Sequence, residues 1–219
     1  MARRIELATK ACVALAESLD SAGVPFEVLG HMTHIPNGDA VDAYYNFDED
    51  KDRPIGRVES VLMPMFKGFN QTLRQARGAM GAMETLPDGA NADADAILMA
   101  GERLLKRREK RKVLMVLSDG EPAWRSRMKG KGSNWEDYAN QLTRDVVHTM
   151  EAKGIETVGI GIQSTSVASF YERHAIVRDM DDLGKQMLDQ LGKVLLGNRF
   201  KADNKDLIQA REGARRAVA

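Results

Sequence analysis

The sequence has one cysteine, few aromatic residues and no excess of charge of either sign, and each absence excludes a class of protein. The single cysteine, Cys12, excludes an internal disulfide and favours a reducing compartment, so we expect a cytoplasmic location. Aromatic residues make up 5% of the chain, which leaves few stacking platforms for single-stranded nucleic acid. The 32 Lys and Arg residues balance 32 Asp and Glu residues, so the positive field of a general nucleic-acid-binding protein is missing. We therefore expect no nucleic-acid partner.

Long hydrophobic runs are absent as well. No run approaches the length that a membrane-spanning helix needs, and the first residues lack the apolar core of a signal peptide. We therefore expect no membrane partner. The composition that remains, 43% hydrophobic and 29% charged residues in 219, is typical of a soluble globular chain with one domain and its own core.

Segments with helical periodicity alternate with short apolar runs along the chain. Helices are expected at residues 3–22, 58–83, 93–107, 135–153 and 183–195, and strands at residues 26–30, 113–117, 155–162 and 175–177. This alternation predicts an α/β fold with a doubly wound parallel sheet. We expect the domain to cover residues 1–196, with a polar insertion at 35–57 and a charged tail at 197–219.

Two local patterns give sharper expectations. In the first helix, an apolar stripe is expected to face the core, and it consists of Ile5, Ala8, Cys12, Leu15 and Leu19. Its cysteine is therefore predicted to be a core residue, not a reactive thiol. Residues 107–112 are mostly basic and are interpreted as a solvated connection between a helix and a strand.

The first candidate for chemistry is Asp119, at the carboxyl end of the most apolar predicted strand. Ligands of parallel α/β sheets bind outside the carboxyl ends of the strands. A carboxylate at this position can bind a hard divalent cation. It can equally cap the turn that an Asp-Gly sequence predicts. The position alone leaves both interpretations open.

A second group of oxygen ligands, Asn91, Asp93 and Asp95, surrounds the start of a predicted helix. Aspartates in the first helical turn complement the helix dipole, and we favour that role for Asp93 and Asp95. Asn91 precedes the helix, so its side chain is freer to reach a ligand.

Familiar catalytic and nucleotide-binding motifs are missing from the sequence. There is no phosphate-binding P-loop, no G-x-S-x-G and no H-E-x-x-H. His31 and His34 would point to opposite faces of a strand, so they do not form a metal-binding pair. Catalysis by a familiar arrangement of residues is therefore unsupported.

The stretch from Leu114 to Pro122, LMVLSDGEP, resembles the second half of a von Willebrand factor A (vWA) domain. An ordered set of further segments makes the resemblance closer to the C-terminal vWA domain of the cobaltochelatase CobT subunit. These segments are residues 27–30 with Thr33, 95–105, 111–120, 159–162, 170–171 and 183–184. Together they extend the resemblance over about residues 1–196.

The resemblance implies a Rossmann-like, doubly wound sheet and a cation at a metal-ion-dependent adhesion site (MIDAS). Asp119 matches the aspartate of the last cation-binding loop, and Asn91, with Asp93 close by, matches the middle loop. The first loop, Asp-x-Ser-x-Ser at the end of the central first strand, has no counterpart in this sequence. We therefore expect Mg²⁺ binding to be weak or absent. We also expect the chain to be a downstream piece of a longer protein, with an upstream polypeptide supplying the first strand.

The function implied is that of a non-catalytic, metal-dependent protein-interaction module. It would work beside an AAA+ ATPase and a large chelatase subunit during ATP-dependent insertion of cobalt in cobalamin biosynthesis. Glu121 and Trp124 follow the cation loop and are candidates for partner contact. One alternative is a vWA module that partners another AAA+ ATPase. A second is a metal-dependent phosphohydrolase, which would need an acidic nucleophile on the first strand.

Overall fold

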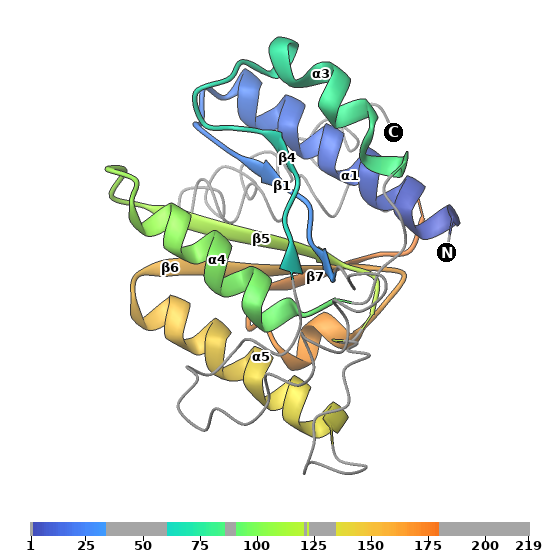
Figure 1. Cartoon of the computed structure of the whole chain (residues 1–219), viewed down its shortest axis with the longest axis vertical. Helices are drawn as coiled ribbons and strands as arrows, with labels where there is room; N and C mark the ends of the chain where they lie inside the picture. Colours follow the sequence, from blue (N-terminus) through green and yellow to red (C-terminus); the bar gives the residue numbers. More distant parts are fainter. Residues whose placement is uncertain (1, 34–60, 86–90, 121, 123–134, 180–219) are drawn as a thin grey trace, which may run out of the picture.

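The computed structural model describes residues 2–33, 61–85, 91–120, 122 and 135–179 (Figure 1). Several expectations fall outside these residues. They are the insertion at 35–57, the contact residues Glu121 and Trp124, and the last helix and tail after residue 179.

Three parallel strands form the centre of the described structure. They are β5 (Lys112–Ser118), β6 (Ile155–Ile162) and β7 (His174–Val177), in the order β5-β6-β7. The register pairs Leu114 with Thr157 and Ile160 with Ala175. The prediction of an α/β fold with a parallel sheet is confirmed, and all three strands occur where the apolar runs predicted them.

Helices cover both faces of this sheet. On one face lies α1 (Ala2–Ser21), and on the other lie α4 (Asp93–Leu105) and α5 (Trp135–Ala152), side by side (Figure 1). Alternate residues of β5 point to the two faces: Val113, Met115 and Leu117 pack against the α1 cluster, Leu114 and Val116 against the α4–α5 cluster. Apolar contacts on both faces explain why the strand is apolar throughout and does not alternate.

The start and end of α1 agree with the sequence, but its buried stripe is shifted. Gly23 ends the helix with φ +65°, and its N–H donates to the carbonyl oxygen of Asp20 at 3.0 Å. Ile5 is 45% exposed, so its predicted core position is wrong. The buried stripe consists of Leu7, Ala11, Leu15 and Ala16, because α1 packs against two different layers. Cys12 packs in the second of these layers, and burial raises the pKa of its thiol to about 11.

The predicted helix at residues 58–83 is wrong in its first half. That part forms two short strands, β3 (Val61–Leu62) and β4 (Met65–Lys67). Pro64 lies between them, and it lacks the N–H that a helix interior requires. The helix itself, α3 (Leu73–Gly81), begins after Thr72, whose hydroxyl accepts from the N–H of Gln75 in a capping box. A short 3₁₀ turn, Met83–Thr85, follows it.

These short strands pair with the segment that follows α1. The first strand, β1 (Val28–Leu29), pairs antiparallel with β4, and β2 (Met32–Thr33) pairs antiparallel with β3. A separate core cluster joins α1 and α3 to this region, and Figure 1 shows the two helices side by side. On α4, Arg103 binds Glu27 in a bidentate ion pair, which ties the start of β1 to that helix. Within the described residues, β1 and β5 do not pair with each other.

The connection from α4 to β5 is basic and carries its own counter-charges. Arg107 forms an ion pair with Glu109, and Arg111 forms one with Glu156 of β6. The interpretation of residues 107–112 as a solvated connection is confirmed. No helix in the described residues is both long and apolar enough to cross a membrane.

Gly161 in β6 allows the following loop to fold back over the end of the strand. A Cβ atom at this position would lie 2.0 Å from the main-chain oxygen of Ser164. Gln163 adopts φ 54°, and its N–H donates to the carbonyl oxygen of Val177 at 2.8 Å, which fixes the turn. The conformation of this loop therefore requires a residue without a side chain at position 161.

We predict that Gly161→Ala lowers the free energy of unfolding by about 1–3 kcal/mol, because the loop must move away from the added methyl group. The matched control is Gly78→Ala in α3, where a Cβ meets nothing within 4 Å. That change should stabilise the chain by about 0.5–1 kcal/mol, because alanine favours a helix. Urea unfolding followed by circular dichroism measures both, and equal effects of the two changes would contradict the prediction.

Candidate functional site

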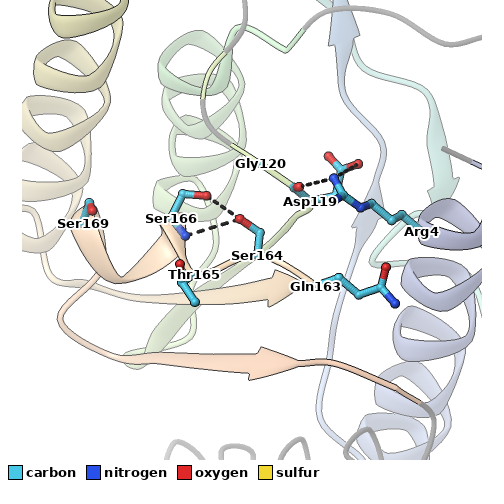
Figure 2. Close-up of a pocket in the computed structure, with 8 residues that line it drawn as sticks. All are labelled: Arg4, Asp119, Gly120, Gln163, Ser164, Thr165, Ser166 and Ser169. Atoms are coloured by element: carbon cyan, nitrogen blue, oxygen red, sulfur yellow. Dashed lines mark hydrogen bonds and ion pairs between the residues drawn. The ribbon is translucent and has the colours of Figure 1, made fainter.

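A polar cavity of about 430 Å³ lies at the carboxyl ends of β5 and β6 (Figure 2). Three segments supply its walls: the first turn of α1, the turn after β5 and the loop after β6. The lining residues are Arg4, Asp119, Gly120, Gln163, Ser164, Thr165, Ser166 and Ser169. Every one is polar, charged or glycine. This is the edge at which a parallel sheet binds its ligands, and Asp119 lies there as the sequence predicted.

The Asp119 carboxylate projects beside the cavity with about half of its surface exposed. The turn that follows β5 is held by Ser118, whose hydroxyl donates to the carbonyl oxygen of Gly120 at 2.9 Å. Within the described residues, the contacts of Asp119 are with Arg4: the guanidinium Nη1 donates to the Asp119 main-chain oxygen at 3.1 Å and lies 4.0 Å from Oδ2. Since a neighbouring serine holds the turn, the carboxylate remains available to a ligand.

Asp93 is the first residue of α4, and its side chain is almost completely buried. Its Oδ1 lies 3.0 Å from Nε2 of His31, a residue between β1 and β2. The amide nitrogen of Asn91 donates to both carboxylate oxygens, at 3.3 and 3.4 Å. Asp93 is thus held by two neighbours and by the positive end of the helix dipole. Asp93 and Asp95 both lie in the first turn of α4, at the positions that the sequence predicted.

The charge of Asp93 also acts on two neighbouring side chains. Burial lowers the pKa of His31, but the hydrogen bond and charge of Asp93, together with the charge of Asp119, outweigh burial and leave that pKa raised. Burial raises the pKa of the Tyr171 hydroxyl, and the charge of Asp93 raises it further. His31 is therefore within electrostatic reach of both aspartates that the sequence selected.

The arrangement limits what kind of metal these residues can hold. Among the described residues, no three His, Cys, Asp or Glu side chains gather into a metal-binding group. Mg²⁺, however, is usually held by one or two carboxylates and keeps several waters. Asp119 offers an exposed carboxylate, whereas the oxygens of Asp93 are already engaged by His31 and Asn91. The donor set therefore fits a weakly held, largely hydrated Mg²⁺ at Asp119 better than a closed protein cage.

Arg4, His31 and the loop after β6 are the parts of this site that the sequence reasoning missed. Strand alternation excludes His31 from a metal-binding pair, but it gives no sign of the contact between His31 and Asp93. The loop carries Gln163, Ser164, Thr165 and Ser166 directly after a strand that was predicted correctly. Since the carboxyl-end rule applies to every parallel strand, it could have identified this loop as well. Arg4 gave no such signal, because its contact with Asp119 spans 115 positions of sequence.

Comparison with known proteins gives a family match and distant relatives. The family model of the cobalamin biosynthesis protein CobT VWA domain matches residues 1–197. An uncharacterized protein, YojO of Bacillus subtilis (strain 168), is 27% identical over 188 residues, which cover 82% of this chain and 26% of YojO. The chain thus spans about a quarter of the length of that relative. No solved structure matches the chain.

We predict that Asp93→Asn lowers the pKa of His31, because the change removes the carboxylate charge and leaves burial as the main influence. NMR titration of the histidine ring measures this shift. The raised pKa also means that the ion pair stabilises the wild type fully below about pH 6.5, and that this stability is lost as the pH rises through the raised value.

In Asp93→Asn, the free energy of unfolding should therefore fall by about 1–3 kcal/mol at pH 5.5 and by less at pH 8.5. The control is Asp145→Asn on α5, which removes a carboxylate that accepts from Gln141 and is remote in sequence from both His31 and Asp93. A His31 titration that is the same in both variants would contradict the assignment.

Proposed function

The chain belongs to the CobT VWA-domain family, and we propose that it is the protein-interaction module of a cobaltochelatase subunit in cobalamin biosynthesis. The family match over residues 1–197 carries this proposal. The polar carboxyl edge of the sheet, with an exposed aspartate and no catalytic constellation recognised in the sequence, supports a binding role. In this proposal the chain has no catalytic activity of its own. It acts in the cytoplasm beside an AAA+ ATPase and a large chelatase subunit.

The proposed contact is metal-dependent and centred on Asp119. Its carboxylate is the principal ligand. Asn91 and Asp93, which the resemblance matches to the middle cation loop, would reach the cation only by giving up the hydrogen bonds that join them to each other and to His31. Mg²⁺, when bound, supplies an open coordination position that a carboxylate of the partner can fill. Glu121 and Trp124 extend the contact along the chain that follows β5. The exposure of Asp119, with about half its side chain open to solvent, is the feature that supports this assignment.

A second element of the proposal is that the sheet has room for one more strand beside β5. Every residue of β5 is only half-buried, although five consecutive residues are apolar. In β6, all residues except Glu156 are buried. Both faces of β5 are covered by helices, and within the described residues its second edge has no strand partner, so we attribute the exposure of this strand to that edge. We infer that an upstream polypeptide supplies a strand between β5 and β1.

The free edge makes a prediction for hydrogen exchange. The β5 amides that point away from β6 should exchange roughly tenfold or more faster than the amides of β6, because they lack a strand partner. Hydrogen–deuterium exchange resolved by NMR measures individual amides. The β5 amides that donate to β6 serve as the internal control. Uniform protection across β5 would contradict the open edge.

Partner capture tests the interaction role. We predict that the tagged chain, co-expressed with the AAA+ ATPase and large chelatase subunit of its organism, retains both in buffer with Mg²⁺. Asp119→Ala and added EDTA should each reduce the retained ATPase roughly tenfold, because a central contact is lost. The matched control is Asp20→Ala, an exposed aspartate near the other end of α1, which should retain both partners.

The outcomes separate the parts of the proposal. Retention that is unchanged by Asp119→Ala and by EDTA contradicts the metal-dependent contact. Retention of a different AAA+ ATPase, with no binding to the chelatase subunits, contradicts the role in cobalt insertion and favours the alternative partnership. Hydrolysis of phosphate esters by the chain alone, lost in Asp119→Ala, would contradict the non-catalytic role.

A further inference from the structure

Arg4 contacts Asp119 both at its main-chain oxygen and beside its carboxylate. The guanidinium Nη1 lies 3.1 Å from the main-chain oxygen of Asp119 and 4.0 Å from its carboxylate Oδ2. Figure 2 shows the arginine reaching from α1 toward Asp119. Both side chains are about half exposed, so the contact can open without unfolding its surroundings.

From this contact we infer that Arg4 is a built-in counter-ion that sets the cation affinity of Asp119. The inference rests on the proposed Mg²⁺ site and goes beyond it, because it assigns a specificity-determining role to a residue outside the ligand set. A positive charge about 4 Å from the carboxylate neutralises it in the cation-free state and repels a divalent ion that approaches the same oxygens. Mg²⁺ binding then requires the guanidinium to leave Asp119.

The cavity also holds hydrogen-bonding groups besides Asp119. Ser164, Ser166 and Ser169 line it together with Arg4, and each carries a hydroxyl group. Figure 2 shows these serines on the loop and 3₁₀ turn after β6, where the Ser164 and Ser166 hydroxyls are hydrogen-bonded to each other. The edge of the sheet around Arg4 is therefore polar, which suits a guanidinium that leaves Asp119 for solvent.

Because Arg4 lies in the first turn of α1, its distance from Asp119 depends on where this helix packs on the sheet. The same helix packs Leu7, Ala11 and Leu15 against the face of the sheet, which holds its first turn next to the strand ends. The guanidinium is thus brought to Asp119 by the core packing of α1, and a shift of this helix along the sheet would change the cation affinity.

The test compares Mg²⁺ affinity by isothermal titration calorimetry in four proteins: wild type, Arg4→Gln, Arg4→Lys and Arg77→Gln. Arg4→Gln removes the charge and should bind Mg²⁺ roughly two- to fivefold more tightly, as expected for an exposed charge about 4 Å away. Arg4→Lys keeps the charge and should bind like the wild type. Arg77→Gln removes an exposed charge from α3 and should also bind like the wild type.

A second readout is the increase in melting temperature on adding Mg²⁺, which should be larger for Arg4→Gln than for the other three proteins. If the wild type binds Mg²⁺ through Asp119 and Arg4→Gln binds it equally or more weakly, the role of Arg4 is overturned and the metal site stands. If neither the wild type nor Arg4→Gln binds Mg²⁺, the metal site and the role of Arg4 are both overturned.

Discussion

The packing of α1 is the interaction on which the rest of the structure depends. One side of this helix contributes Leu7, Ala11 and Leu15 to the core that covers β6 and β7. Another side contributes Ala16 to the cluster with Phe26, Phe66 and Met80, which organises β1, β4 and α3. Since no hydrogen bonds join β1 to β5 within the described residues, side-chain packing on α1 and the Arg103–Glu27 ion pair connect the two layers. The helix also delivers Arg4 to the strand ends.

The partners of two aspartates distinguish their environments at the carboxyl edge of the sheet. The two aspartates selected from the sequence are compensated differently: Asp93 is buried and held by His31 and Asn91, whereas Asp119 is half exposed and faces Arg4. A buried carboxylate with two hydrogen-bonding partners has little to gain from a further ligand. An exposed carboxylate with one half-exposed counter-ion can exchange that ion for another. The difference in burial therefore favours Asp119 over Asp93 as the proposed cation ligand.

The parts of the fold that could be predicted are those in which local pattern and burial agree. The apolar strands β5 and β6, the helix α4 and the terminating Gly23 follow from apolar runs, periodicity and backbone conformation. The helix predicted at residues 61–67 is wrong because Val61, Met65 and neighbouring apolar residues also fit a helical spacing. Pro64 and the pairing with the segment after α1 make these residues strands instead. The predicted burial of Ile5 is wrong for a related reason. The side of α1 that becomes buried depends on two packing partners, and periodicity alone does not identify them.

The sequence by itself determined the class of the fold, the family and the candidacy of Asp119, because these depend on patterns within single segments. The tertiary structure alone decided which groups meet at the site. Arg4 meets Asp119 across 115 positions, and His31 meets Asp93 across 62. It also showed that, among the described strands, β5 pairs on one edge only, since half-burial of an apolar strand becomes visible only when its neighbours are in place. Contacts of this kind depend on how helices and strands pack in space, and no local spacing encodes them.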